Sequence, residues 1–149
     1  MPGPFRDAPL PEDPQARMLL LGEILWLLMH SPLHRRLTVD AVEAYFVAPL
    51  MRNRLRFFRR GAAPVGLVTW AHLGPEAEAR YLAGELALRP EDWDSGQQLW
   101  FVDMIAPFGD GRAISSDMRR RIPPGQVGKA SRRNPDGSLR RVVSYTPLS

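Results

Sequence analysis

The sequence contains no cysteine, so disulfides, thiolate nucleophiles and cysteine-ligated zinc are excluded. Lysine is nearly absent as well, because Lys129 is the only lysine among the 20 basic residues and the others are arginine. Codon bias would explain this, but an enzyme that modifies lysines would also gain from offering few of its own. The lack of cysteine suits a cytoplasmic protein.

Long hydrophobic runs are also missing. The longest, from Met18 to Met29, is interrupted by Gly22 and Glu23 and is shorter than the roughly 20 residues that cross a bilayer. The opening MPGPFRDAPLPEDP lacks the basic-then-apolar order of a secretory signal. We therefore expect a cytoplasmic protein without stable membrane insertion.

What is present is a composition typical of a globular protein, with 44% hydrophobic and 24% charged residues. A length of 149 residues predicts one domain that is large enough to bury a core. Residues 1–14 contain five prolines and little periodicity, which indicates a flexible arm. We assign residues 15–149 to the single domain.

Positive charge is concentrated toward the end of the chain. The net charge is +4, and residues 101–149 hold nine basic side chains against four acidic ones. Such a surface attracts nucleic acid, anionic lipid or an acidic protein. A simply solvated basic face fits equally well.

The periodicity predicts an α+β fold around one mixed or antiparallel sheet. Pro32 should end the first helix region in a turn, and Pro49 should end the second helix. GAAPVG is the expected turn between two strands, and LWFVDMIAPF the expected buried central strand. The expected helices lie at about 14–29, 39–48, within GPEAEARYLAGELAL and at about 113–121, with a last hairpin around 134–137.

Asp103 stands inside the apolar central strand, where an unpaired carboxylate costs several kcal/mol. It either bonds to backbone amides or an arginine, or it orients a histidine for acid–base chemistry. Of the three histidines, His34 follows the SPL turn and suits the edge of a cleft, whereas His30 lies near the helix end and His72 near a strand end. His30 and His34 are four residues apart, but Pro32 between them argues against a shared metal site.

Two weaker signals accompany these residues. Ser31 is a nucleophile, a hydrogen-bond donor or a helix-end residue, and no G-x-S-x-G elbow surrounds it. Gly109 and Gly111 precede a predicted helix, whose first backbone amides can hold a phosphate or an oxyanion.

Two longer motifs carry a resemblance to a known family. LGEILWLLMHSPLHR resembles the opening L-G-x-x-x-W-L-x-x-x-S-P-L-H-R of the toxin-activating lysine acyltransferases that mature RTX toxins. EDWDSGQQLWFVDMIAPFGD, residues 91–110, resembles that family's E-D-W-x-S-G-x-x-x-W-F-x-D-x-I-A-P-F-G-D. Weaker likeness in VTWAHL, ARYL, DMRRR and VGKAS extends the resemblance over most of residues 21–131.

The resemblance implies a GNAT-like fold, with a central mixed, mostly antiparallel sheet flanked by helices. It also implies transfer of a fatty acyl group from acyl carrier protein to internal lysine ε-amines of an RTX protoxin. The family's essential histidine and aspartate fall on His34 and Asp103, with Ser31 in support. The acyl donor is the acylated phosphopantetheine of the carrier protein, and we expect no bound cofactor and no metal.

The chemistry of the residues agrees with this implication. A lysine amine has an ordinary pKa near 10.4 and must lose a proton before it attacks a thioester, and an imidazole paired with a carboxylate can accept that proton. The residues expected to bind the acyl and phosphopantetheine groups are Ile105, Ala106, Pro107, Phe108, Gly109, Gly111 and Arg112. The arginines expected to dock the acidic carrier protein are Arg119, Arg120 and Arg121.

One departure concerns RRRIPPGQVGK, because family members usually have a longer segment there. The short link bears on the docking surface, on the far wall of an acyl pocket and on the oligomeric state, for which we allow a homodimer. Two alternatives are open: a relative that has lost catalysis, or a basic module that holds nucleic acid with Phe57, Phe58 and Trp70. The second leaves Asp103 without a purpose, so we expect no nucleic acid.

Overall fold

A computed structural model describes residues 4–6 and 8–149 of the chain. The helical elements are α1 (Pro14–Met29), α2 (Val39–Val42), η1 (Glu43–Val47), α3 (Ala48–Met51), α4 (Pro75–Leu82), η2 (Pro90–Trp93) and α5 (Gly111–Arg120). The strands are β1 (Leu55–Arg60), β2 (Ala63–Leu73), β3 (Gln98–Ile105), β4 (Gly128–Arg133) and β5 (Leu139–Tyr145).

The strands form one five-stranded sheet in the order β1-β2-β3-β4-β5. All neighbours are antiparallel except β3 and β4, which run parallel. The apolar run from Gln98 to Ile105 is therefore the middle strand, as its composition predicted. The sheet is mixed and mostly antiparallel.

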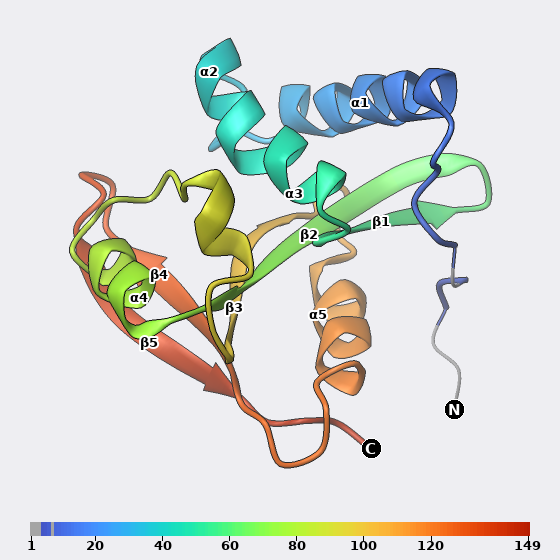
Figure 1. Cartoon of the computed structure of the whole chain (residues 1–149). Helices are drawn as coiled ribbons and strands as arrows, with labels where there is room; N and C mark the ends of the chain where they lie inside the picture. Colours follow the sequence, from blue (N-terminus) through green and yellow to red (C-terminus); the bar gives the residue numbers. More distant parts are fainter. Residues whose placement is uncertain (1–3, 7) are drawn as a thin grey trace.

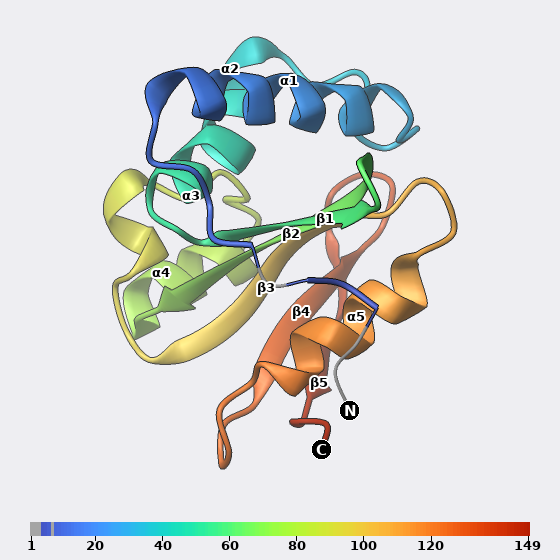
Figure 2. The same cartoon turned by 90° about the vertical axis from the view of Figure 1, so that its right-hand side faces the viewer.

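Helices cover both faces of this sheet. α1 and the α2–η1–α3 run lie over one face, and α5 lies over the other (Figures 1 and 2). Each layer has its own core: Ile24 of α1 and Phe46 belong to one cluster of buried residues, whereas Phe58 and Ile114 of α5 belong to another. This is the GNAT-like α+β arrangement that the sequence motifs implied.

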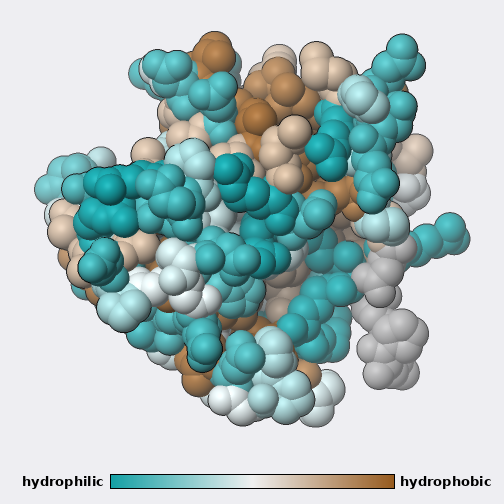
Figure 3. Space-filling view, viewed as in Figure 1, coloured by the Kyte–Doolittle hydropathy of each residue, from teal (hydrophilic) through white to brown (hydrophobic). Residues whose placement is uncertain are grey.

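Helix α1 begins with Asp13, whose carboxylate accepts the Ala16 N–H at 2.8 Å, and Pro14 occupies the first turn. Its inner side is buried, but its outer side is apolar too, and Figure 3 shows apolar surface gathered at this end of the molecule. Within the described residues, no helix combines the length and the apolar character needed to cross a membrane.

The second helical region differs from the expectation that Pro49 would end it. The helical run continues to Met51, because the Ala48 N–H bonds to the Glu43 carbonyl in one wider turn of π-helix. A proline ring normally clashes with the carbonyl four residues earlier, and the wider turn places Pro49 at the start of a new α-helical turn, where its missing N–H is tolerated.

The expected turn GAAPVG was also too long. Strand β2 already begins at Ala63, which pairs with Arg60, so only Gly61 and Ala62 connect the strands. Pro64 is accepted within the strand because the register shifts beside its partner Arg59. The expected helix at 113–121, the helix after Gly74 and the final hairpin are present, with small shifts at their ends.

The described part of the N-terminal arm contacts the domain. Phe5 is 9% exposed, and its ring meets that of Phe58 at a centroid distance of 4.9 Å. Pro11 accepts a hydrogen bond of 2.7 Å from the Arg17 side chain. The predicted arm also includes residues 1–3 and 7, which lie outside the described residues.

Candidate active site

The loop after α1 carries His34. The helix ends at Met29 with His30 as its C-cap, and the chain then turns tightly, with the N–H groups of His34 and Arg35 donating to the Ser31 carbonyl at 3.0 and 2.9 Å. Pro32 within this turn prevents the helix from continuing. The turn therefore directs the His34 side chain back toward the sheet.

Asp103 reaches the same place from the middle strand. It pairs with Thr69 on β2, but the next pair is Phe101 with Trp70, so Val102 is an extra residue in β3. A bulge of this kind redirects side chains and locally interrupts the ladder. It allows Asp103 to face the α1 loop within a strand that is otherwise mostly apolar.

The two side chains are in direct contact. His34 Nε2 lies 2.8 Å from Asp103 Oδ1, and His34 Nδ1 lies 2.6 Å from Ser31 Oγ. The side chains of His34 and Asp103 are 14% and 23% exposed, and Ser31 is buried. One tautomer satisfies both contacts: Nε2–H donates to Asp103, and Nδ1 accepts the hydroxyl hydrogen of Ser31.

This arrangement can transfer protons. The Asp103 carboxylate fixes the ring and stabilises an imidazolium, while Nδ1 is the nitrogen that is able to accept a proton. Any group that donates to Nδ1 must displace the Ser31 hydroxyl or pass its proton through it. Ser31 is therefore part of the cluster.

Three further side chains near Asp103 were not singled out from the sequence. Burial raises the pKa of Tyr81, and the nearby charge of Asp103 adds to this effect. The Tyr81 hydroxyl lies 3.5 Å from Ser131 Oγ, and Thr69, opposite Asp103, is fully buried. These residues fall within ARYL, VGKAS and VTWAHL, so the weaker likeness of those segments was the signal that pointed to them.

The other two histidines have different surroundings. His30 bonds through Nδ1 to the Trp26 carbonyl at 2.8 Å, and its ring lies between those of Trp26 and Phe108. Burial, assisted by the charge of Arg54, lowers the pKa of His72, although Asp94 opposes the shift. The structure thus places His34, and neither His30 nor His72, against Asp103.

The residues expected to bind the acyl and phosphopantetheine groups lie at the end of β3 and the start of α5. Gly109 has φ +95°, which glycine adopts without strain, and Asp110 forms an ion pair with Arg60. Phe108 is 47% exposed beside His30. The others differ in burial: Ile105 is in the core, Ala106, Pro107 and Gly111 are partly buried, and Arg112 is exposed.

The three arginines near the end of α5 are already engaged in part. Arg119 donates to the Thr146 carbonyl at 3.2 Å, and its guanidinium lies 5.8 Å from the centre of the Tyr145 ring. Arg121 donates to Asp117 at 3.0 Å. Arg120 is partly buried and Arg121 exposed, so the end of α5 carries positive charge at the surface.

A gap in the sheet adjoins the cluster. Strands β3 and β4 pair only at Leu99 with Gly128 and at Trp100 with Lys129, and then they diverge. The gap holds a cavity of about 90 Å³, whose lining includes Asp103 of β3, Ser131 of β4 and Met118 of α5. Asp103 is therefore reached by His34 from one side and by this cavity from another.

A GNAT-like sheet with such a cluster beside a gap fits an acyltransferase, and comparison with known proteins specifies the kind. Residues 13–146 match the model of the RTX toxin acyltransferase family, and the chain belongs to that family.

Three relatives illustrate the similarity. The RTX-I toxin-activating lysine-acyltransferase ApxIC of Actinobacillus pleuropneumoniae is 33% identical over 85% of this chain and 73% of its own length. The protein-lysine myristoyltransferase HlyC of Escherichia coli is 35% identical over 85% and 74%. The protein-lysine palmitoyltransferase CyaC of Bordetella bronchiseptica is 32% identical over 95% and 77%.

Proposed function

We propose that this protein transfers a fatty acyl group from acyl carrier protein to lysine ε-amines of an RTX protoxin. The relatives named above are lysine acyltransferases, and the one from A. pleuropneumoniae carries toxin activation in its name. The observation that carries the proposal is the 2.8 Å contact between His34 and Asp103, which are 69 residues apart in the sequence.

The proposed reaction begins with the lysine amine. It releases a proton to His34 Nδ1, either directly or through the Ser31 hydroxyl, and Asp103 stabilises the resulting imidazolium. The neutral amine nitrogen then bonds to the thioester carbonyl carbon, and the nitrogen of the tetrahedral intermediate, which still carries two hydrogens, releases one proton to water. When the tetrahedral intermediate collapses, the carbon–sulfur bond breaks and the thiolate takes the proton from His34. The products are an amide and the free carrier thiol, without an acyl-enzyme intermediate.

The donor would lie along the end of β3. The turn from Gly109 to Gly111 offers backbone amides at the start of α5, which suit the phosphate of phosphopantetheine or an oxyanion. The ion pair of Asp110 with Arg60 reduces the repulsion that this carboxylate would exert on an anion. Carrier protein is acidic, and Arg119, Arg120 and Arg121 supply complementary charge at the other end of α5, about 13 Å along the helix from that turn.

The test combines acylated carrier protein, a lysine-containing protoxin fragment and mass spectrometry. We expect acylation of lysine by the wild type. His34→Ala and Asp103→Asn should each lower kcat by on the order of 10²- to 10⁴-fold, because the base or its stabilising charge is lost. His30→Gln is a matched control, because the His30 ring bonds to a backbone carbonyl. This substitution should leave most of the activity.

Other results would contradict the proposal in different ways. Wild-type rates in both His34→Ala and Asp103→Asn would remove the proposed centre. Binding of carrier protein without turnover on any lysine would indicate a relative that has lost catalysis. Salt-sensitive binding of DNA, without acylation, would favour a basic nucleic-acid-binding module.

A further inference from the structure

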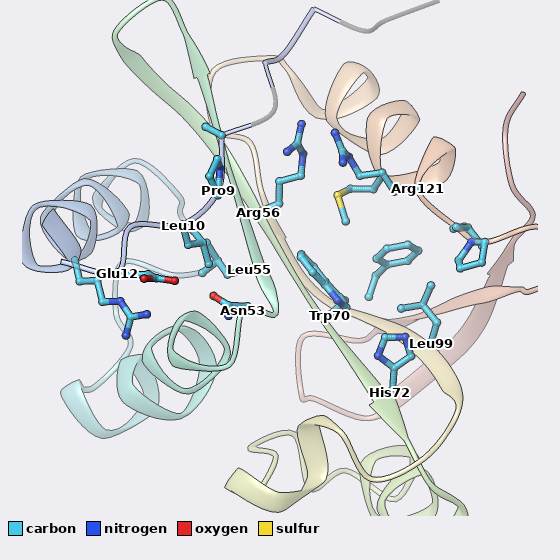
Figure 4. Close-up of a pocket in the computed structure, with 16 residues that line it drawn as sticks. Pro9, Leu10, Glu12, Asn53, Leu55, Arg56, Trp70, His72, Leu99 and Arg121 are labelled. Carbon is cyan, nitrogen blue, oxygen red and sulfur yellow. The ribbon is translucent and has the colours of Figure 1, made fainter. Parts of the chain in front are cut away.

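A larger cavity lies on the α5 face of the sheet, away from His34. Its volume is about 570 Å³, within the range of about 300 to 1,000 Å³ typical of small-molecule sites. Strands β1 to β3, the end of α5 and the N-terminal segment enclose it, as the positions of Pro9, Trp70, Leu99 and Arg121 show in Figure 4. Its apolar lining includes Leu55, Trp70, Leu99, Phe101, Met118 and Ile122. Polar and charged side chains also line it: Glu12, Arg17, Asn53, Arg56, His72 and Arg121.

This cavity adjoins the small cavity at Asp103. Phe101 and Met118 line both, so these two side chains form the wall between them. The small cavity occupies the gap where β3 and β4 diverge, and Asp103 lines it. Phe101 and Met118 therefore separate the cavity at Asp103 from the larger cavity.

We propose that the larger cavity holds the distal part of the donor's acyl chain, an inference that rests on the proposed function. The thioester carbonyl would lie at His34 and Asp103, and the chain would pass between β3 and β4 toward Leu99. Relatives of this chain are named for transfer of myristoyl and palmitoyl groups, whose long chains need an apolar site. Each buried methylene contributes roughly fourfold in affinity.

The shared wall consists of two side chains, one aromatic and one flexible. The Phe101 ring lies against Gly128, where an added Cβ would approach Cε2 of that ring to 2.6 Å, so glycine provides the room for the ring. Met118 is unbranched and adapts its shape to neighbouring groups. Rotation of Phe101 and Met118 would join the two cavities, and the size of these side chains would set the chain length that fits.

The outer side of α1 offers the competing place for an acyl chain. Its groove is lined by Met18, Leu19 and Trp26, which are 68%, 72% and 50% exposed. A chain lying there would keep much of its surface in water. None of the residues that line this groove lines either of the two cavities that meet at Phe101.

Chain-length preference tests the assignment through the shared wall. We compare kcat/KM for octanoyl and palmitoyl carrier protein in Met118→Trp, which would block the path, and in Ser116→Trp as a control. Ser116 lies on the same helix but lines neither cavity. Met118→Trp should lower the palmitoyl-to-octanoyl ratio at least about 15-fold, the effect of excluding two methylenes, whereas Ser116→Trp should leave it unchanged. An unchanged ratio in Met118→Trp would overturn the inference.

Photo-cross-linking gives an answer that does not depend on whether Met118→Trp folds. The wild-type protein is irradiated with carrier protein that bears a hexadecanoyl chain with a terminal diazirine, and the adducts are mapped by peptide mass spectrometry. We expect adducts on Trp70, Leu99 or Ile122. Adducts on residues 18–26 of α1, or none on the cavity, would overturn the inference.

Lysine acylation by the same preparation separates this inference from the proposed function. Acylation with adducts on α1 would overturn only the placement of the chain. Adducts in the cavity without acylation of any lysine would support an acyl-binding site and contradict the proposed transfer. If no adducts form in the cavity and no lysine is acylated, both the inference and the proposed function are contradicted.

Discussion

Asp92 is the residue whose replacement should most clearly show what holds the EDWDSG segment in place. It is 2% exposed, and its carboxylate accepts hydrogen bonds from both terminal nitrogens of Arg80, at 3.0 and 2.9 Å, and from the Arg89 N–H at 2.9 Å. Asp92→Asn keeps the shape of the side chain but removes its charge. It also places an NH₂ group against donors.

The magnitude follows from this geometry. Removing one partner of a buried ion pair costs about 3 to 5 kcal/mol, because the other charge stays without compensation. The Arg80 side chain is 28% exposed, so water offsets part of the loss. We therefore expect Asp92→Asn to lower the free energy of unfolding by about 2 to 3 kcal/mol. For a chain of this size that corresponds to a fall in Tm of about 4 to 12 °C.

The pH dependence provides a stricter check. The bond from Arg80, more than the other contacts, lowers the pKa of Asp92 below its ordinary value of 3.8. Its contribution is therefore complete above the unfolded pKa and is lost as the pH falls through the folded pKa. The difference between wild type and Asp92→Asn should stay constant from pH 7 to about 5 and shrink only below about 4.

The measurement is urea unfolding followed by circular dichroism at several pH values. Asp40→Asn is the control, because the same chemical change is made at an exposed carboxylate at the start of α2, where the unfolding midpoint should barely move at pH 7. A loss below about 0.5 kcal/mol for Asp92→Asn at pH 7, the size of an ordinary surface change, would refute the reasoning. So would a difference that grows as the pH falls from 7 to 5.

Three further substitutions test local packing and charge. Gly96→Ala should lower the free energy of unfolding by about 1 to 3 kcal/mol in the same urea assay, because its Cβ would overlap the Gly74 backbone. Gly22→Ala, in a helix with open space around it, should instead raise the free energy of unfolding by about 0.5 to 1 kcal/mol. If Gly96→Ala were the more stable of the two variants, the account of both glycines would be contradicted. Burial, with help from Arg54, lowers the pKa of His72 below 6.5, so its stabilisation is present above the unfolded pKa and is lost as the pH falls toward the folded one. His72→Gln should therefore lose less stability than wild type between pH 7 and pH 5. If the free energy of unfolding from urea titrations falls equally with pH in both proteins, this explanation is wrong.

The second long motif shows why a resemblance in sequence does not assign roles by itself. Trp93 is fully buried, and Ser95 accepts the Gly74 N–H at 3.0 Å and donates to the Asp92 carbonyl at 2.8 Å. Together with the Asp92–Arg80 pair, these contacts fix the loop that leads into β3. Most of EDWDSG therefore supports the strand that carries Asp103, and Asp103 alone of this motif touches His34.

Where predictions from the sequence were wrong, a distant contact or an unusual local geometry was the reason. Pro49 was expected to end a helix, but a π-helical turn made it the start of the next helical turn. Pro64 was expected in a loop, but a bulge admits it to β2. Tyr81 and Ser131 were missed because no local pattern shows that residues of α4 and β4 come near Asp103.

The sequence by itself determined the local elements and the family. Caps, prolines and apolar spacing specify α1, β3 and the last hairpin, because they act over a few residues. Only the tertiary structure decided that His34, Asp103 and Ser31 form one cluster, and that the cavity lined by Asp103 shares Phe101 and Met118 with a larger cavity. The order of strands, the bulge at Val102 and the packing of α1 and α5 set those relations, and each depends on contacts between segments far apart in the chain.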